Sequence, residues 1–193
     1  IMFILAVCTL IGGCGGGSKP APGDGIPDGG VVSSPFKDPN YADYYPGKWH
    51  SAADITAAVD TPVLAEARGQ VERLILAGMH TAVIVKHRLM EPYQTASGPE
   101  QYVHVMYGAV DPSVTGGDVV DVGDQVGTVI FRADGSRLQL AVRIGEDITS
   151  AYPMQNLVGG QIPPADAYGL TDGWIDPIDF FATHAPDNNW PEP

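Results

Sequence analysis

Cysteine and basic side chains are scarce in this sequence, and each shortage excludes a class of protein. The two cysteines, Cys8 and Cys14, both lie near the start of the 193-residue chain, so no disulfide can staple the rest of it. Lys and Arg together number 10 against 23 Asp and Glu, which gives a formal net charge of −13. Because such a chain repels phosphate, we expect no nucleic-acid partner.

The apolar run at residues 2–11 is too short to span a bilayer, but it has the length of a signal-peptide core. It is followed by Ile11-Gly12-Gly13-Cys14, which resembles a bacterial lipobox, the motif whose cysteine becomes lipidated after cleavage. We therefore expect an extracytoplasmic lipoprotein, in the periplasm or at the cell surface, anchored to a membrane through Cys14. An ordinary secretory signal with an incidental cysteine is the alternative.

Turn-forming residues are abundant, with 24 Gly and 17 Pro, and Val, Ile and Thr recur in short runs. This composition favours an all-β domain with many turns over a helical bundle. Residues 15–46 are rich in Gly, Pro, Ser and Asp and have no apolar periodicity, so we predict a flexible tether there. The predicted organisation is a signal peptide over 1–14, this tether, one domain over 47–183 and a polar tail over 184–193.

Short segments rich in β-branched residues and bounded by Gly indicate successive strands. They cover residues 61–65, 69–76, 81–87, 101–108, 117–131 and 137–143, with a loop expected at 91–99 and a tight turn at 133–136. An apolar segment at 173–181 closes the domain.

A histidine and a carboxylate stand four residues apart at His50 and Asp54. On one face of a strand or a helix, these side chains could supply two of the three protein ligands of a catalytic zinc. Ser51 and Asp54 also form a capping-box pattern, which could begin a helix in the Ala-rich stretch that follows. The local pattern leaves both possibilities open.

The order of motifs resembles the M23 family of zinc peptidases, the LytM or lysostaphin-like endopeptidases that cut peptidoglycan cross-bridges. The family pattern His-x-Gly-x-Asp-Ile is similar to His50-Ser51-Ala52-Ala53-Asp54-Ile55, and Tyr-x-His-Leu is similar to Tyr107-Gly108-Ala109-Val110. The Gly-Asp-x-Val repeats within 117–127 and Trp174-Ile175-Asp176-Pro177 match later landmarks. The resemblance implies an antiparallel sheet that forms a partly open barrel-sandwich.

The departures from the family pattern fall on its catalytic residues. The family's His-x-His pair is replaced by Arg137-Leu138-Gln139, and the histidine of Tyr-x-His-Leu falls on Ala109. Of the zinc ligands that the resemblance implies, His50 and Asp54 carry over, and Gln139 takes the third place. Arginine stays protonated and cannot act as a base, and an amide is a poor zinc ligand, so we expect no catalytic residue and doubt that zinc binds. An alternative alignment places the Tyr-x-His element on 102–105.

The resemblance therefore suggests a catalytically degenerate domain that binds peptidoglycan or a cell-wall hydrolase partner. The alternative is an active zinc endopeptidase that recruits His104 or His87 as its third ligand. A structural lipoprotein whose sheet serves only for assembly is a third possibility.

Overall fold

A computed structural model describes residues 26–27, 29–38, 40, 43, 49–77, 80–95, 98–146, 161–162 and 173–191. The expected signal peptide, its lipobox and Cys14 lie outside these residues, as does the first part of the expected tether. Within the described part of the chain, no helix is long and apolar enough to cross a membrane.

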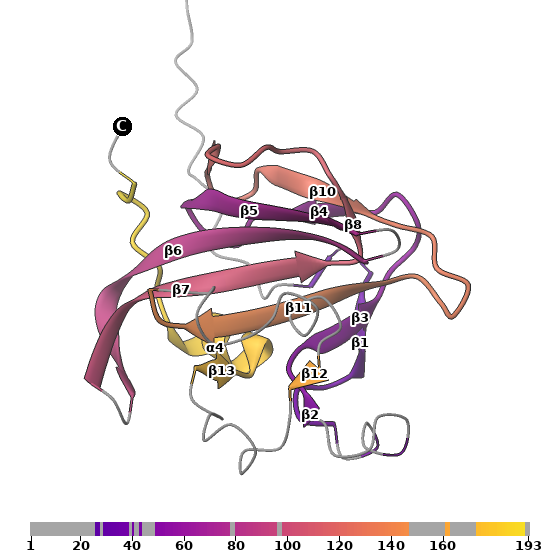
Figure 1. Cartoon of the computed structure of the whole chain (residues 1–193), viewed down its shortest axis with the longest axis horizontal. Helices are drawn as coiled ribbons and strands as arrows, with labels where there is room; N and C mark the ends of the chain where they lie inside the picture. The colour runs from indigo at the N-terminus through magenta and orange to yellow at the C-terminus, as the bar shows by residue number, and fades with distance from the viewer. Residues whose placement is uncertain are drawn as a thin grey trace, which may run out of the picture.

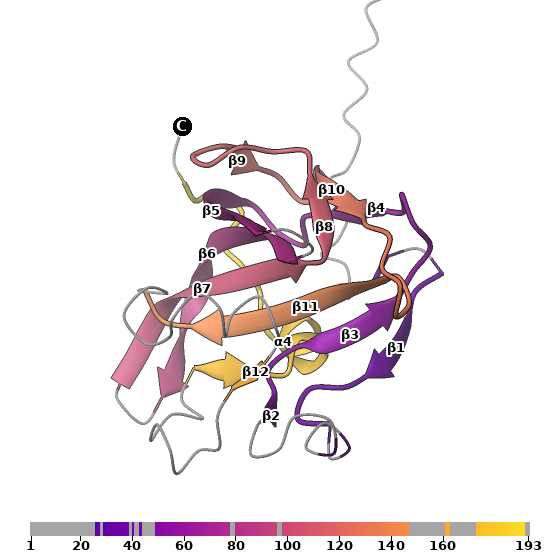
Figure 2. The same cartoon turned by 45° about the vertical axis from the view of Figure 1, so that its right-hand side comes forward.

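The main sheet has eight strands, and all of its pairs are antiparallel. Seven strands follow one path, and a short eighth strand pairs with β11 beyond the end of β3 (Figures 1 and 2). In spatial order the path is β1 (Val31–Ser34), β3 (Ala53–Thr56), β11 (Arg137–Ile144), β7 (Gly98–Gly108), β6 (His80–Thr95), β5 (Gly69–Ala77) and β9 (Val119–Val120), and the eighth strand is β13 (Trp174–Ile175).

Two smaller sheets and a helix complete the described structure. They are the sheet of β4 (Pro62–Leu64), β10 (Gln125–Val129) and β8 (Val110–Pro112), the pair of β2 (Trp49–His50) with β12 (Gln161–Ile162), and helix α4 (Pro177–Thr183). The predicted all-β, antiparallel fold class is confirmed, and the sheets do not close into a barrel.

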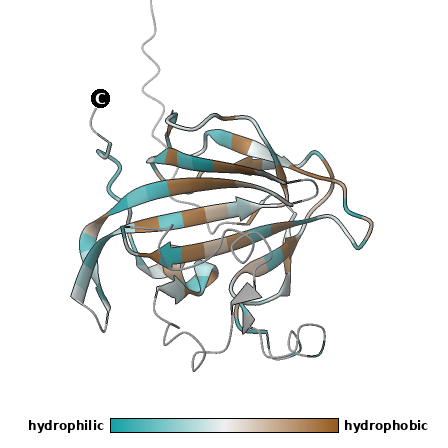
Figure 3. Ribbon diagram, viewed as in Figure 1, coloured by the Kyte–Doolittle hydropathy of each residue, from teal (hydrophilic) through white to brown (hydrophobic). Residues whose placement is uncertain are grey.

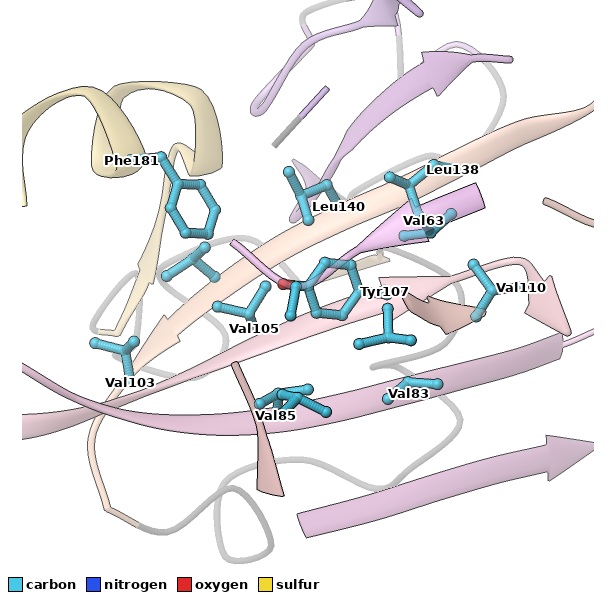
Figure 4. Packing of buried hydrophobic residues seen from close by; sticks show 14 of the residues in the cluster. Val63, Val83, Val85, Val103, Val105, Tyr107, Val110, Leu138, Leu140 and Phe181 are labelled. Atoms are coloured by element: carbon cyan, nitrogen blue, oxygen red, sulfur yellow. The ribbon is translucent and has the colours of Figure 1, made fainter. Parts of the chain in front are cut away.

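Strand alternation divides the main sheet into two faces, with hydrophobic and polar residues interleaved along the central strands (Figure 3). One face, which we call the core face, packs against α4 and the small three-stranded sheet. Its side chains point into a shared interior (Figure 4), and the buried members include Val83, Val85, Val103, Val105, Tyr107, Leu138, Leu140 and Phe181. Removing each such side chain from water stabilises the fold by about 1.5–3 kcal/mol.

The opposite face of the main sheet, which we call the site face, carries both polar and apolar side chains. A second buried cluster lies there, formed by Ala52, Ile75, Ala82, Ile84, Met106, Ala141 and Trp174, with Phe36 packed against it. The residues that alternate with the core residues on β11 are Arg137, Gln139, Ala141 and Arg143. The site face therefore brings charged groups close to a small apolar patch.

The folded part of the chain begins earlier than composition indicates. The tether was expected to run to residue 46, but β1 at Val31–Ser34 pairs with β3 inside the main sheet. A four-residue strand between Gly and Pro has too little periodicity to be recognised, and it is stabilised by pairing with a distant strand. The expected polar tail also contacts the domain, because Pro186 forms a bridge with Leu89 and the Trp190 ring lies 5.5 Å from the Tyr102 ring.

One alternative that the sequence left open is decided, and one further expectation is corrected. The Ser51–Asp54 capping-box pattern does not begin a helix, since Ala53–Thr56 is strand β3. The loop expected at 91–99 is largely strand, because β6 continues to Thr95 and β7 begins at Gly98. In both cases pairing with neighbouring strands outweighs local sequence preference.

Candidate functional site

The His50 and Asp54 side chains meet at the start of β3. The His50 Nε2 atom lies 3.4 Å from the Asp54 Oδ1 atom. His50 is fully buried, and the Asp54 side chain is 12% exposed. A turn between β2 and β3 brings the two residues together, with the imidazole and the carboxylate converging on one point.

The other ring nitrogen of His50 has its own partners. Nδ1 lies 3.0 Å from the Pro35 carbonyl oxygen and 3.2 Å from the Ser34 hydroxyl oxygen. That hydroxyl donates to the Asp38 carboxylate at 2.8 Å, while the Asn40 backbone N–H and the Ser34 hydroxyl lower the pKa of the Asp38 carboxyl. A hydrogen bond from Nδ1 to a carbonyl directs Nε2 toward Asp54, which is how metal-ligating histidines are commonly oriented.

Gln139 lies beside Asp54, as expected. The two residues are Cα partners across β3 and β11, so their side chains leave the same face of the sheet. Gln139 is in turn the partner of Gly108 on β7. A Cβ atom on Gly108 would lie 3.2 Å from the Gln139 Cβ and 3.6 Å from its Oε1, so glycine leaves space for the glutamine side chain.

Arg137 occupies the other side of Asp54. Its Nε atom lies 3.2 Å from the Asp54 Oδ2 atom, and its Nη2 donates to the Asp134 Oδ2 at 2.8 Å. Hydrogen bonds from Arg132, together with the Arg137 charge, lower the pKa of the Asp134 carboxyl to about 2. The guanidinium is therefore held between two carboxylates, one in the site and one in the turn before β11.

Ala109, which the sequence resemblance puts at a catalytic histidine position of M23 peptidases, is buried and 2% exposed. Its φ of 60° lies in the left-handed region, its N–H donates to the Thr81 carbonyl, and its carbonyl accepts from Ile130. It follows Gly108, the residue beside Gln139.

The residues at this site fit one half of a zinc centre. Two ligands that each lie about 2.0–2.1 Å from a tetrahedral zinc are about 3.4 Å apart, which matches the separation between His50 and Asp54. The other half does not fit, because Gln139 offers only a neutral amide and the Arg137 guanidinium already neutralises Asp54. Among the described residues, no group of three His, Cys, Asp or Glu side chains is placed to hold a metal.

Neither histidine suggested as a substitute ligand reaches the site. His87 belongs to the core face, where burial lowers its pKa to about 4 against the raising effect of its hydrogen bond to the Arg68 carbonyl. His104 is on the site face but pairs with Arg143, four residues along β11 from Gln139. At about 3.3 Å per strand residue, that separation is about 13 Å.

His104 instead forms a second histidine–carboxylate pair, which sequence reasoning missed. Its Nε2 atom lies 2.6 Å from the Glu72 Oε2 atom. The β5–β6 register shifts between Val71 and Arg73, so Glu72 lies in a β-bulge, on the opposite side of β5 from the core residue Val71. A bulge of this kind has no clear sequence signal, and the same is true of the Pro35 and Ser34 contacts of His50, which come from a segment expected to be a tether.

Comparison with known proteins identifies the architecture. No protein-family model matches the chain, and no curated protein matches it. Among solved structures, a zinc-containing peptidase from Vibrio cholerae is similar with a TM-score of 0.50 and 16% identity, over 65% of this chain and 37% of that one. A putative M23 peptidase from Pseudomonas aeruginosa has a TM-score of 0.40 and 22% identity, over 65% of this chain and 44% of that one. A variant of the catalytic domain of the prophage-encoded M23 protein EnpA from Enterococcus faecalis has a TM-score of 0.46 and 21% identity, over 64% of this chain and 90% of that one.

The chain thus shares its antiparallel β fold with the zinc-containing peptidase from Vibrio cholerae. It spans 37% and 44% of the length of the first two structures. The likeness to the first of these structures supports the fold alone, and the activity has to be argued from the site itself.

Proposed function

We propose that this protein is a catalytically degenerate M23-type domain that binds peptidoglycan or a cell-wall hydrolase partner through its site face. The observation that carries the proposal is the Arg137 guanidinium, which lies 3.2 Å from Asp54. A tethered cation competes with zinc for the same carboxylate. Without a bound zinc no water is acidified for attack on a peptide bond.

We further propose that lipidation of Cys14 anchors the chain outside the cytoplasm, in the periplasm or at the cell surface. The lipobox-like Ile11-Gly12-Gly13-Cys14 supports this. Metabolic labelling with a fatty-acid analogue and membrane fractionation test it, with Cys14→Ser as the comparison. Label and membrane association should both be lost in the variant, and equal labelling of the two chains would contradict lipidation at Cys14.

A zinc and digestion assay tests the loss of catalysis. The full chain is equilibrated with zinc, desalted and assayed for bound metal, and then incubated with purified peptidoglycan and added zinc. We expect less than stoichiometric zinc and no release of muropeptides. His50→Ala provides the control, because any zinc held at this site must fall away in that variant.

The second candidate is an active zinc endopeptidase. The 3.4 Å separation between His50 and Asp54 and the oriented His50 ring favour it. Stoichiometric zinc that is lost in His50→Ala, together with muropeptide release, would establish this alternative and overturn the degenerate assignment.

Sedimentation with insoluble peptidoglycan tests the binding role. Wild-type chain should be retained, and Arg137→Ala should be retained less, because the guanidinium stands at the centre of the proposed surface. Asp111→Asn, an exposed change on β8, provides a matched control. If the wild-type chain is not retained, direct binding to peptidoglycan is excluded, and co-purification with purified cell-wall hydrolases then tests the partner role.

A further inference from the structure

A cavity of about 310 Å³ lies away from the strand pair that holds Asp54 and Gln139. Its walls come from the turn after β1, from β13, from α4 and from the far end of β6. Its volume is at the lower end of the range of small-molecule sites, enough for one side chain or a small ligand. Neither the fold nor the proposed function assigns it a role.

Aromatic rings dominate the walls of this cavity. The Phe180 and His184 rings are stacked, with centroids 5.0 Å apart and an interplanar angle of 9°. The Tyr93 ring lies 5.1 Å from the His184 ring, and Phe36 and Trp174 also line the cavity. The faces of such rings carry partial negative charge and attract cations.

Two carboxylates lie among these rings. Asp176 caps α4 by accepting the Ile178 N–H at 3.0 Å, and Asp179 stands in the first turn of the helix. Asp179 is exposed, and its carboxylate makes no hydrogen bond or ion pair with any residue that the structure describes. A cavity lined by aromatic faces and acidic groups is complementary to a positively charged ligand.

An ammonium group of the chain itself already occupies this environment. The Lys37 side chain lines the cavity, and its Nζ atom lies over the Phe36 ring at 5.4 Å from the centroid. Lys37 has a φ of 55°, a conformation that costs a non-glycine residue about 1 kcal/mol or more, and its N–H donates to the His50 carbonyl at 2.9 Å. The turn thus places a lysine at the aromatic wall in spite of backbone strain.

We propose that this cavity binds a primary alkylammonium group, such as a lysine-type side chain of a peptide, and that Lys37 is its internal competitor. The bound group would lie against the aromatic faces with its charge toward Asp179. This inference does not depend on the state of the zinc site. Pro35 and Lys37 both contact His50, so a ligand bound in the cavity would also affect the turn that orients the His50 imidazole.

Titration calorimetry on the full chain at low ionic strength tests the proposal, with Nα-acetyl-lysine methylamide as the probe. The norleucine analogue has the same aliphatic stem without the charge, and N-acetylglucosamine tests the sugar that an aromatic wall could also accept. We expect saturable binding of the lysine probe and a norleucine affinity lower by roughly threefold or more, the size of an exposed cation–π contact.

Substitutions in the cavity test whether it is the binding site. Asp179→Asn should weaken binding of the lysine probe by roughly threefold or more, and Lys37→Ala should strengthen it by a similar factor because the competitor is gone. Asp111→Asn is the matched charge control and should leave the affinity unchanged. Thermal melts of each variant separate lost binding from lost folding.

Several results would overturn the proposal. They are the absence of saturable binding in both wild type and Lys37→Ala, an affinity that Asp179→Asn does not change, and equal affinity for the lysine and norleucine probes. Saturable binding of N-acetylglucosamine without binding of the lysine probe would assign the cavity to a sugar instead.

Discussion

The two faces of the main sheet use histidine in opposite ways. On the core face, His87 is fully buried, and desolvation lowers its pKa to about 4, so it is a neutral packing residue at physiological pH. On the site face, His104 lies 2.6 Å from the Glu72 carboxylate, and His50, just before β3, lies 3.4 Å from Asp54. Strand alternation alone separates these roles, because a shift of one residue moves a side chain from one face to the other.

The faces also differ in charge. Lys86, His104 and Arg143 are consecutive Cα partners across β6, β7 and β11, and Arg137 lies further along β11. Carboxylates lie beside these groups, since Glu72 is 2.6 Å from His104, Asp54 is 3.2 Å from Arg137 and Glu146 is 4.0 Å from Lys86. The difference teaches that the core face maintains the fold, while the site face holds the paired charged groups and the residues at which the sequence departs from the M23 pattern that it resembles.

Adjacent residues on β11 test the division into two faces. Leu140 is fully buried on the core face, so Leu140→Ala should lower the free energy of unfolding by about 3 kcal/mol through lost burial and a cavity. Gln139→Ala, one residue away on the site face, should cost less than about 1 kcal/mol. Urea denaturation measures both, and equal losses would show that the site face is as important for stability as the core face.

Placing the M23 histidine pair at positions 137 and 139 tests the site face directly. Arg137→His with Gln139→His removes the competing guanidinium and adds an imidazole beside Asp54, so zinc affinity should rise by roughly 100-fold or more. Competition with a chromogenic chelator measures the affinity. Adding His50→Ala should abolish the gain, and unchanged zinc affinity in the double variant would mean that positions 137 and 139 do not converge with His50.

The sequence was sufficient for the fold class and for the pairing of Gln139 with Asp54 across two strands, because both depend on order and alternation along the chain. Gln139 was placed beside Asp54 through the motif order, and the β3–β11 register agrees. The partners of His50 could not be predicted, since Ser34 belongs to a short strand in a Gly- and Pro-rich segment. The Glu72–His104 pair depends on a bulge, and one extra residue in a strand leaves no pattern to read.

Acid titration tests the neutral state assigned to His87. Its pKa is about 4 in the folded chain and 6.5 in the unfolded chain, so the unfolded state takes up a proton first as the pH falls. Stability is therefore complete above pH 6.5 and declines toward pH 4, by about 2 kcal/mol between pH 7 and pH 5. Urea denaturation of wild type and His87→Gln over this range should show a steeper decline in the wild type, and parallel curves would mean that His87 does not stay neutral.

The pair formed by the β-bulge should have the smallest measurable effect. Glu72→Gln keeps the shape of the side chain and an acceptor for His104, but it removes the negative charge. Because the Glu72 side chain is 36% exposed, solvent screens the interaction, and we expect the free energy of unfolding to fall by no more than about 1 kcal/mol. Glu146→Gln is the matched control, since Glu146 is 74% exposed and lies 4.0 Å from Lys86, and it should change stability by less than about 0.5 kcal/mol. If both substitutions are equally neutral in urea denaturation at pH 7, the bulge places Glu72 beside His104 without stabilising the sheet.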